Sequence, residues 1–129
     1  MYKKSIAILL LLFAAGNLCA QEAPPAGNKK FMQITTIESV ISGGMGRSKM
    51  IITHPDGTQA ESDMENLFSM VGINFKNIKE NENQVVRTLK TYTDDGWKLE
   101  QVIPFALAPG EKSSGIFLTR YLLSKTFDK

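Results

Sequence analysis

The chain of 129 residues contains one cysteine and one histidine, and its charges nearly cancel. One cysteine cannot form a disulfide within the chain. Because the chain also has only one histidine, it cannot supply a Cys/His zinc site or a catalytic triad with a spare base. Fifteen Lys and Arg against thirteen Asp and Glu give a net charge of +2. That balance excludes a protein that binds nucleic acid through bulk electrostatics. The length allows one small domain.

The first twenty residues have the pattern of a secretory signal peptide. A basic start with Lys3 and Lys4 is followed by an uninterrupted apolar run of 11 residues from Ile6 to Gly16. That run has the length of a signal-peptide core and is too short to cross a bilayer as a helix. Because the small residue Ala20 precedes Gln21, we predict residues 1–20 as a signal peptide that is cut between these two. Cleavage after Gly16 is the alternative.

Removal of residues 1–20 makes the chain neutral. Loss of Lys3 and Lys4 reduces fifteen basic residues to thirteen, and thirteen acidic residues remain. A neutral chain has little attraction for an anionic membrane surface. We therefore expect a periplasmic or secreted protein with no stable membrane insertion. The alternative is a lipid anchor at Cys19, although Leu18 stands where a small residue normally precedes a lipidated cysteine.

The remainder divides into a spacer and one domain. Residues 21–30 contain two Pro, two Ala and one Gly, and no large apolar side chain. We predict a disordered spacer there. Residues 31–125 carry the periodic apolar patterns and are predicted to form a single α+β domain.

Two strands joined by a glycine-rich link are predicted at the start of the domain. Residues 31–41 are rich in β-branched side chains, and residues 47–53 form a second segment of this kind. The sequence HPDG at residues 54–57 is a strong turn signal. We expect an antiparallel hairpin, with His54 as an exposed turn residue, because no second histidine or nearby cysteine is present to build a metal site.

Two helices are predicted in the middle of the domain. Residues 63–71 carry apolar side chains at the i, i+3, i+4 and i+7 spacing of a short helix. The clearer helix spans residues 78–95. Asn77 is its expected N-cap, Glu80 completes a capping box, and Gly96 follows its C-terminus.

Two further strands complete the predicted sheet. Residues 97–105 begin in alternation, with Trp97, Leu99 and Gln101 on one side. Residues 115–123 are apolar on both faces, with Ile116, Leu118 and Leu122 on one and Phe117, Tyr121 and Leu123 on the other. We predict an antiparallel sheet of about four strands with one main helix on one face, in the order β-β-(short α)-α-β-β.

The two-faced last strand indicates a partner. A strand that is apolar on both sides belongs in the middle of a sheet that is covered on both sides. One long helix covers only one face, so the other face needs the short helix or another subunit. We therefore expect a homo-oligomer or a second envelope protein as the partner.

Two stretches at the C-terminal end share features with a known family. They are the helix that leads into the Gly96-Trp97 junction, with the strand after it, and the last strand with Thr119-Arg120-Tyr121. The C-terminal half of the chain thereby resembles a small bacterial family, domain of unknown function four-one-seven-seven, in which Glu stands at the position of Lys98. The resemblance implies a compact α+β domain. It implies no reaction, because none is known for the family.

A glycine-rich loop is the first candidate site. Its residues are Gly43, Gly44, Gly46, Arg47, Ser48 and Lys49. Backbone N–H groups in such a bend can bind an anion, and Arg47 and Lys49 add positive charge. However, the glycines lead into a strand, whereas a nucleotide-binding loop leads into a helix. The alternative is that they allow the hairpin to turn and bulge.

Arg120 is the second candidate, because it shares a strand face with apolar side chains. A partly buried guanidinium needs an acid or several carbonyl groups. Either it holds a carboxylate or phosphate of a ligand, together with the loop at residues 43–49, or it forms an internal ion pair with Glu38 or Glu100.

No catalytic group, metal-ligand set or cofactor loop is recognisable in this sequence. Asp94 and Asp95 are adjacent at a helix end, whereas paired catalytic carboxylates face each other across a cleft. We therefore predict a non-catalytic binding or assembly module without metal or cofactor. The alternative is a small-anion or nucleotide-type ligand binder, or a minor enzyme, that uses the loop and Arg120.

Processing gives the first test. Mass spectrometry and N-terminal sequencing of the protein recovered from the cell envelope or the medium should find Gln21 as the first residue. An intact Met1 on cytosolic protein would contradict export. A blocked N-terminus at Cys19 with the added mass of lipid would show the lipid-anchored form instead.

Overall fold

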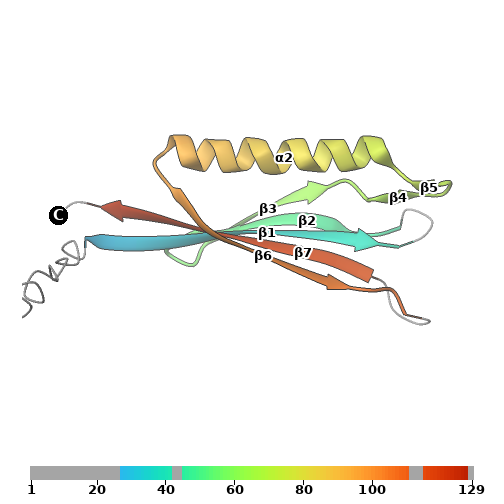
Figure 1. Cartoon of the computed structure of the whole chain (residues 1–129), viewed down its shortest axis with the longest axis horizontal. Coiled ribbons are helices and arrows are strands. Elements are labelled where there is room, and N and C mark those ends of the chain that lie inside the picture. The colour runs from blue at the N-terminus through green and yellow to red at the C-terminus, as the bar shows by residue number, and fades with distance from the viewer. Residues whose placement is uncertain (1–26, 42–44, 111–114, 128–129) are drawn as a thin grey trace, which may run out of the picture.

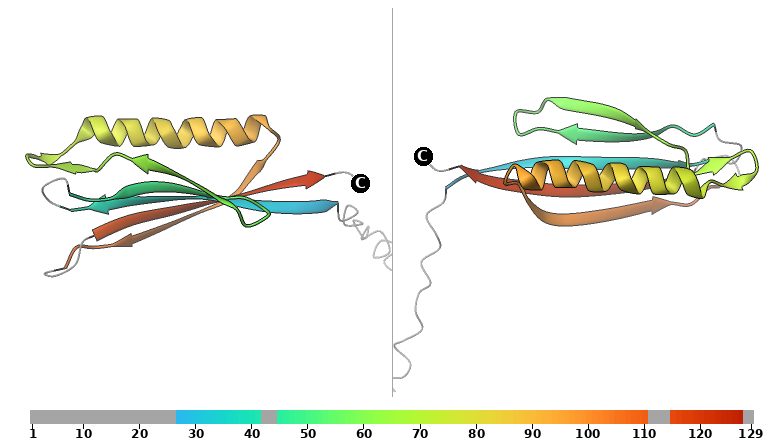
Figure 2. Two further views of the ribbon diagram at one scale, coloured as in Figure 1. Left: turned by 180° about the vertical axis from the view of Figure 1, so that it is seen from behind. Right: turned by 90° about the horizontal axis from the view of Figure 1, so that it is seen from above.

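The computed structural model describes residues 27–41, 45–110 and 115–127, and the predicted signal peptide lies outside these ranges. A five-stranded antiparallel sheet carries one helix on one face (Figures 1 and 2). The sheet order is β3-β2-β1-β7-β6, and β4 and β5 form a separate hairpin. The bounds are β1 Asn28–Val40, β2 Ser48–Thr53, β3 Gln59–Met64, β4 Phe68–Ser69, β5 Gly72–Ile73, α2 Phe75–Asp94, β6 Lys98–Leu107 and β7 Gly115–Phe127.

The predicted α+β class, with one main helix on an antiparallel sheet, is confirmed. The strand count and the order are corrected, because three strands and the small hairpin precede the helix. β1 begins at Asn28, so the last three residues of the range predicted as a spacer lie in a strand.

The first hairpin forms as predicted. β1 and β2 pair antiparallel, with Ile34 opposite Ile52. The turn after β2 closes through a hydrogen bond from the N–H of Gly57 to the carbonyl of His54 at 2.9 Å, and Gly57 has a φ of 85°. The His54 side chain is half-buried rather than exposed, since its ring contacts Tyr92 of the helix edge-on at 6.4 Å between centroids.

The helix predicted over residues 63–71 is wrong. Residues 59–64 form β3, and residues 68–73 form the β4–β5 hairpin. Gly72 has a φ of 116° in the turn of this hairpin, and Val71, expected on the apolar face of the helix, is 97% exposed at the hairpin tip. A helix of two turns has little stability of its own in water, so pairing in the sheet and the glycine turn determine the structure here.

The main helix begins three residues earlier than predicted. Its N-cap is Asn74, whose side chain accepts a hydrogen bond from the N–H of Asn77 at 3.2 Å. Asn77 was predicted as the cap, but its amide donates to the carbonyl of Asn66 at 2.8 Å. The predicted C-terminal role of Gly96 is confirmed by its φ of 85°.

The last two strands are longer than predicted and contain a bulge. β7 extends to Phe127 and pairs with β1 along its whole length. In β6 the register shifts between Leu99 and Gln101. Leu99 therefore faces the helix and Gln101 faces away from it, so the alternation predicted from Trp97 to Gln101 is interrupted.

The hydrophobic core lies between α2 and the sheet and is small. Its buried members are Met32, Ile34, Met50, Met64, Trp97 and Leu123. Even-numbered residues of β1 and odd-numbered residues of β7 face the helix, because directly opposed residues of antiparallel strands share a face. We call the opposite side of the sheet the open face.

Asn81 connects the helix to the sheet through buried hydrogen bonds. Its side chain is 1% exposed. Its amide oxygen accepts from the N–H of Glu65 at 2.8 Å. Its amide nitrogen donates to the carbonyl of Glu65 at 2.9 Å and to Oε1 of Glu38 at 3.0 Å. The segment after β3, the end of β1 and α2 are thereby held together.

Replacing Asn81 with Ala should lower the free energy of unfolding by about 2–4 kcal/mol, because it leaves part-buried polar groups of Glu65 and Glu38 without partners. Asn83→Ala is the matched control on the exposed side of the same helix and should change it by less than about 0.5 kcal/mol. Urea unfolding followed by the fluorescence of Trp97, the only tryptophan, measures both. Equal losses in the two variants would contradict this role of Asn81.

Candidate functional site

Part of the glycine-rich loop lines a pocket at the start of β2. Gly43 and Gly44 lie outside the described residues. The described loop residues Gly46, Arg47, Ser48 and Lys49 line a cavity of about 370 Å³ together with Asp63, Met64 and Asn66. The cavity thus contains one acid beside two basic residues, and one of these, Lys49, pairs with Glu61.

Two residues of this loop already have partners within the domain. The ammonium of Lys49 forms an ion pair with Glu61 across the β2–β3 pair, and this hydrogen-bonded carboxylate raises the pKa of Lys49. The hydroxyl of Ser48 accepts a hydrogen bond from the N–H of Ser39 at 3.1 Å and donates to Asn66. These contacts connect the loop to β1 and β3.

Gly46 is needed for close packing. A Cβ atom at this position would lie 2.7 Å from Oγ and 2.8 Å from Cβ of Ser39. The absence of a side chain at Gly46 lets the loop lie against the end of β1, which is a packing role distinct from the turn and bulge expected for these glycines.

Arg120 is placed apart from the loop. It lies in the middle of β7 on the open face, opposite Thr35 of β1 and Ile103 of β6. Lys49 is opposite Ile37, so strand β1 separates it from β7. Within the described residues Arg120 has no ion pair or hydrogen bond. The structure therefore does not bring the two predicted halves of an anion site together.

The two acids proposed as partners of Arg120 are engaged elsewhere. Glu38 faces the helix and accepts from Asn81. Glu100 accepts a hydrogen bond from Ser124 at 2.5 Å and pairs with Lys29 at 3.0 Å. The hydrogen bond from Ser124 and the ion pair with Lys29 both lower the pKa of Glu100, and the hydrogen bond has the larger effect. The predicted internal ion pair of Arg120 is thus not formed.

The open face carries apolar side chains that the helix does not cover. Register places nine apolar side chains on it, namely Phe31, Ile37, Ile51, Ile103, Phe105, Leu107, Ile116, Leu118 and Leu122. Phe31, Phe105 and Leu107 are 49%, 55% and 49% exposed. No helix or strand of the described residues packs over this face (Figures 1 and 2). Gln33, Thr35 and Arg120 lie between Phe31 and the larger group at residues 103–107 and 116–118. Exposed apolar side chains gathered on one face are typical of an interaction surface.

Both edges of the sheet carry features that oppose the addition of a further strand. β6 is one edge, and it contains Pro104 and the bulge next to Glu100. Proline lacks a backbone donor, and a bulge distorts the ladder, so both features oppose addition of a further strand. β3 is the other edge, and its exposed residues include Glu61 and Asp63.

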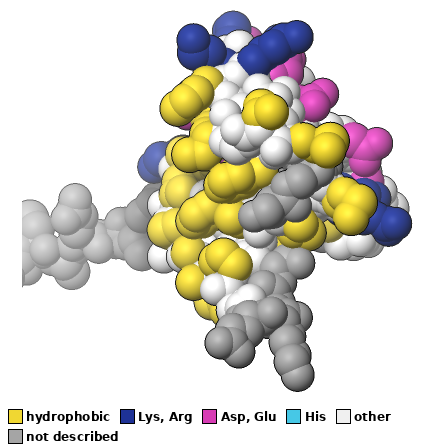
Figure 3. Space-filling model, turned by 90° about the vertical axis from the view of Figure 1, so that its right-hand side faces the viewer, with side chains coloured by type: hydrophobic (Ala, Val, Ile, Leu, Met, Phe, Trp, Pro, Cys, Tyr) yellow, Lys and Arg dark blue, Asp and Glu magenta, His cyan; other side chains and the backbone are white. Residues whose placement is uncertain are grey.

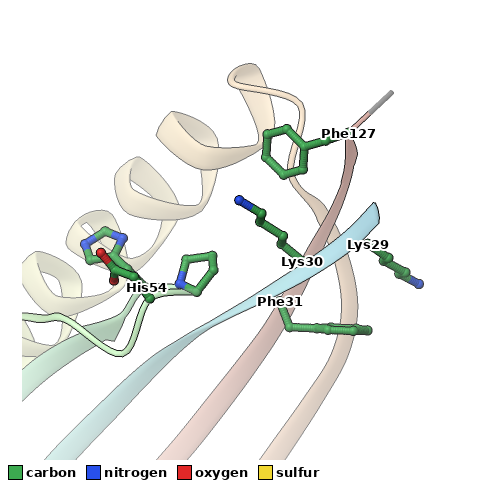
Figure 4. A pocket seen from close by; sticks show the side chains of 7 residues that line it. Lys29, Lys30, Phe31, His54 and Phe127 are labelled. Carbon is green, nitrogen blue, oxygen red and sulfur yellow. The ribbon is translucent and has the colours of Figure 1, made fainter. Parts of the chain in front are cut away.

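A cavity of about 680 Å³ lies near the start of β1, where Lys29, Lys30, Phe31, His54 and Phe127 are among its lining residues. These side chains do not converge. Figure 4 shows Lys30 and Phe127 on one side of β1 and Phe31 on the other. Lys30 lies 5.0 Å from the centroid of Phe127, and Lys29 pairs with Glu100. Each cation is therefore used within the domain.

Sequence reasoning missed Asn81, and it named Glu38 only as a partner of Arg120 and not as a residue beneath the helix. Asn81 and Glu38 look like surface residues in a linear pattern, but the structure places them between α2 and the sheet. One signal was available, since Asn81 lies three residues after Ile78 and four before Val85, on the apolar stripe of the helix.

Comparisons with models of protein families, with curated proteins and with solved structures find no match to this chain. Within the described ranges, no group of three or more His, Cys, Asp or Glu side chains is placed to hold a metal ion. No helix in the described part of the chain has the length and apolar character needed to cross a bilayer.

Gly46→Ala should lower the free energy of unfolding by about 1–3 kcal/mol, because the new methyl group overlaps the Ser39 side chain. Ser39→Gly removes that side chain, so it should restore part of the loss when the two changes are combined. Chemical denaturation of the wild type, both single variants and the double variant gives the coupling. Additive losses would show that the two residues are not in contact.

Proposed function

We propose that the protein is an exported, non-catalytic assembly module, and that a second copy of the chain covers its open face. The observation that supports this proposal is the set of nine apolar side chains on the outer side of β1, β2, β6 and β7. The function follows from the packing surface rather than from a reactive group. The localisation rests on the signal-peptide pattern of residues 1–20.

The size of the open face suits a stable dimer. The four strands that carry its apolar side chains, spaced about 4.8 Å apart over about nine residues of about 3.3 Å each, give roughly 570 Å² for each copy. Two such faces would bury roughly 1,100 Å², which is above the area of about 1,000 Å² that a specific protein interface needs. Two sheets packed face to face about 10 Å apart form a common arrangement, the β-sandwich.

The edges of the sheet favour a closed dimer over an open-ended assembly. Pro104 and the bulge in β6 oppose strand addition at one edge, and the charged residues of β3 oppose it at the other. Association through the face uses the same surface on both copies and is complete at two chains.

Arg120 is compatible with a covered face. It is exposed in the isolated chain and is flanked by Leu118 and Leu122 along β7. An arginine can pack its aliphatic stem against such neighbours while the guanidinium extends across the edge strand β6 toward water. An acid from the opposing copy is an alternative partner for it in the assembly.

Phe105→Asp tests the interface directly. Phe105 is 55% exposed on the open face, so the isolated chain should still fold. A carboxylate buried in the interface without a partner should weaken dimerisation at least about 100-fold. Size-exclusion chromatography with light scattering should show a dimer for the wild type and a monomer for the variant at equal concentration.

Val71→Asp is the matched control. Val71 is also apolar and is 97% exposed, but it lies in the β4–β5 turn and not on the open face. This variant should remain a dimer. A monomeric wild type at about 100 μM, where a specific dimer would be populated, contradicts the proposal. So does dissociation of the two variants to the same extent.

A further inference from the structure

A cleft lies on the other side of the sheet, between the helix and the two central strands. Its volume is about 300 Å³, near the lower end for small-molecule sites. Its floor is formed by Thr36 and Glu38 of β1 and by Thr119 and Tyr121 of β7. Its roof is formed by α2 through Asn81, Glu82, Val85 and Val86. Every lining residue belongs to a helix or a strand, so the site stands on rigid elements.

Hydroxyl groups converge on the floor of this cleft. Thr36 is only 2% exposed and lies directly opposite Thr119 in the β1–β7 ladder. Tyr121 follows two residues along β7. Among the described residues, the hydroxyls of Thr36, Thr119 and Tyr121 have no hydrogen-bond partner. A nearly buried hydroxyl that faces a cavity is available to a ligand.

The charge of the cleft is negative. Glu38 and Glu82 line it, and none of its lining residues is Lys, Arg or His. Neither carboxylate takes part in an ion pair within the described residues. Burial of Tyr121, together with the charge of Glu38, raises the pKa of its hydroxyl. Tyr121 therefore stays neutral near pH 7, and its hydroxyl oxygen can accept a hydrogen bond from a ligand. This charge repels anions and attracts cations.

Apolar side chains extend from the mouth of the cleft. Val86 of the helix is 63% exposed, Phe117 of β7 is 47% exposed and Val102 of β6 is 46% exposed. The register places Phe117 opposite Glu38 and Val102 opposite Tyr121 on the helix-facing side. Figure 3 shows hydrophobic side chains gathered over a continuous area at the end of the molecule where β6 ends and β7 begins. A ligand with an apolar body would find contact area there.

We propose that this cleft binds a small organic cation, a primary amine with a short aliphatic or aromatic body. The ammonium lies between the carboxylate of Glu38 and the hydroxyls of Thr36 and Tyr121, and the body packs on Val85 and Val86. Asn81 holds Glu38 in position by its hydrogen bond at 3.0 Å. A carboxylate that is partly desolvated and has no cationic partner gains most from such a ligand.

The test is a titration of the purified ¹⁵N-labelled protein with n-butylamine at pH 7, followed by NMR. The side-chain amide signals of Asn81 and the backbone signals of Thr36, Thr119 and Tyr121 should shift. n-Butanol and butyrate have the same body without the positive charge, and they should cause no shift at these positions. If no amine shifts the Asn81 signals at concentrations up to about 50 mM, the weakest affinity that counts as a site, the proposal is overturned.

Two carboxyl-to-amide variants locate the cation. Glu38→Gln keeps an acceptor for Asn81 and should weaken butylamine binding at least about tenfold, as expected when one charged hydrogen bond is replaced by a neutral one. Glu80→Gln makes the same change on the exposed side of α2, where Glu80 pairs with Arg87, and should bind as the wild type does. Equal affinity of the two variants would contradict the placement at Glu38.

The same amine chemistry is present in a free metabolite and in a lysine side chain. Titration with the amide of N-acetyl-lysine, compared with butylamine, distinguishes them. Tighter binding of the blocked lysine indicates a polypeptide as the source, and tighter binding of butylamine indicates a free amine. The cleft lies on the opposite side of the sheet from the open face, so the monomeric variant Phe105→Asp should bind butylamine as the wild type does.

Discussion

The pairing of β1 with β7 is the interaction on which the rest of the structure depends. All 13 residues of β1 have a partner in β7, so the two ends of the domain form its centre. β2 and β3 extend the sheet on one side of this pair and β6 extends it on the other. Such pairing between the ends of a chain has a high cost in chain entropy, and it forms only when many contacts form with it. The length of the ladder supplies those contacts.

The alternation of side chains along this central pair produces two surfaces of different chemistry. Thr35 and Arg120 face outward, while their neighbours Thr36 and Tyr121 face the helix. One helix of 20 residues covers only part of a five-stranded sheet. The outward side is consequently left apolar and open, and the helix side keeps a polar cleft where α2 and the strands do not fill the space. Both proposals follow from this incomplete coverage.

Features set by local sequence were predictable. The hairpin of β1 and β2, the positive φ of Gly96 and the two-faced pattern of residues 116–123 depend on β-branched side chains, on glycine and on alternation. The apolar open face follows from the same alternation, and its prediction required no knowledge of the topology. The resemblance of the C-terminal half to a family of unknown function remains a prediction.

Features set by contacts distant in sequence were not predictable. β3 is a polar edge strand whose pairing with β2 depends on the turn before it and not on its own residues. Asn74 caps the helix in place of Asn77, because the Asn77 side chain donates a hydrogen bond to the carbonyl of Asn66. The helical spacing of apolar residues does not reveal this contact. The ion pair expected between Arg120 and Glu38 does not form, because it too depends on contacts distant in sequence. Glu38 was close enough along the strand pair, but the register turns it to the opposite face.

The position of Glu38 separates the two proposals chemically, because it places a carboxylate on the helix side of the sheet and not on the open face. A carboxylate beneath the helix is an unfavourable element next to a core that has six buried apolar side chains in the described part of the chain. It is retained with one hydrogen bond from Asn81, although an apolar side chain in its place would enlarge the core. Its charge is therefore better explained by a ligand on the helix side than by stability. The apolar side chains of the open face need no such ligand in the proposed dimer, where burial against an identical face would stabilise them directly. The open face thus suits an apolar partner, and the helix side suits a cation. A substitution confined to one face leaves the side chains of the other face unchanged.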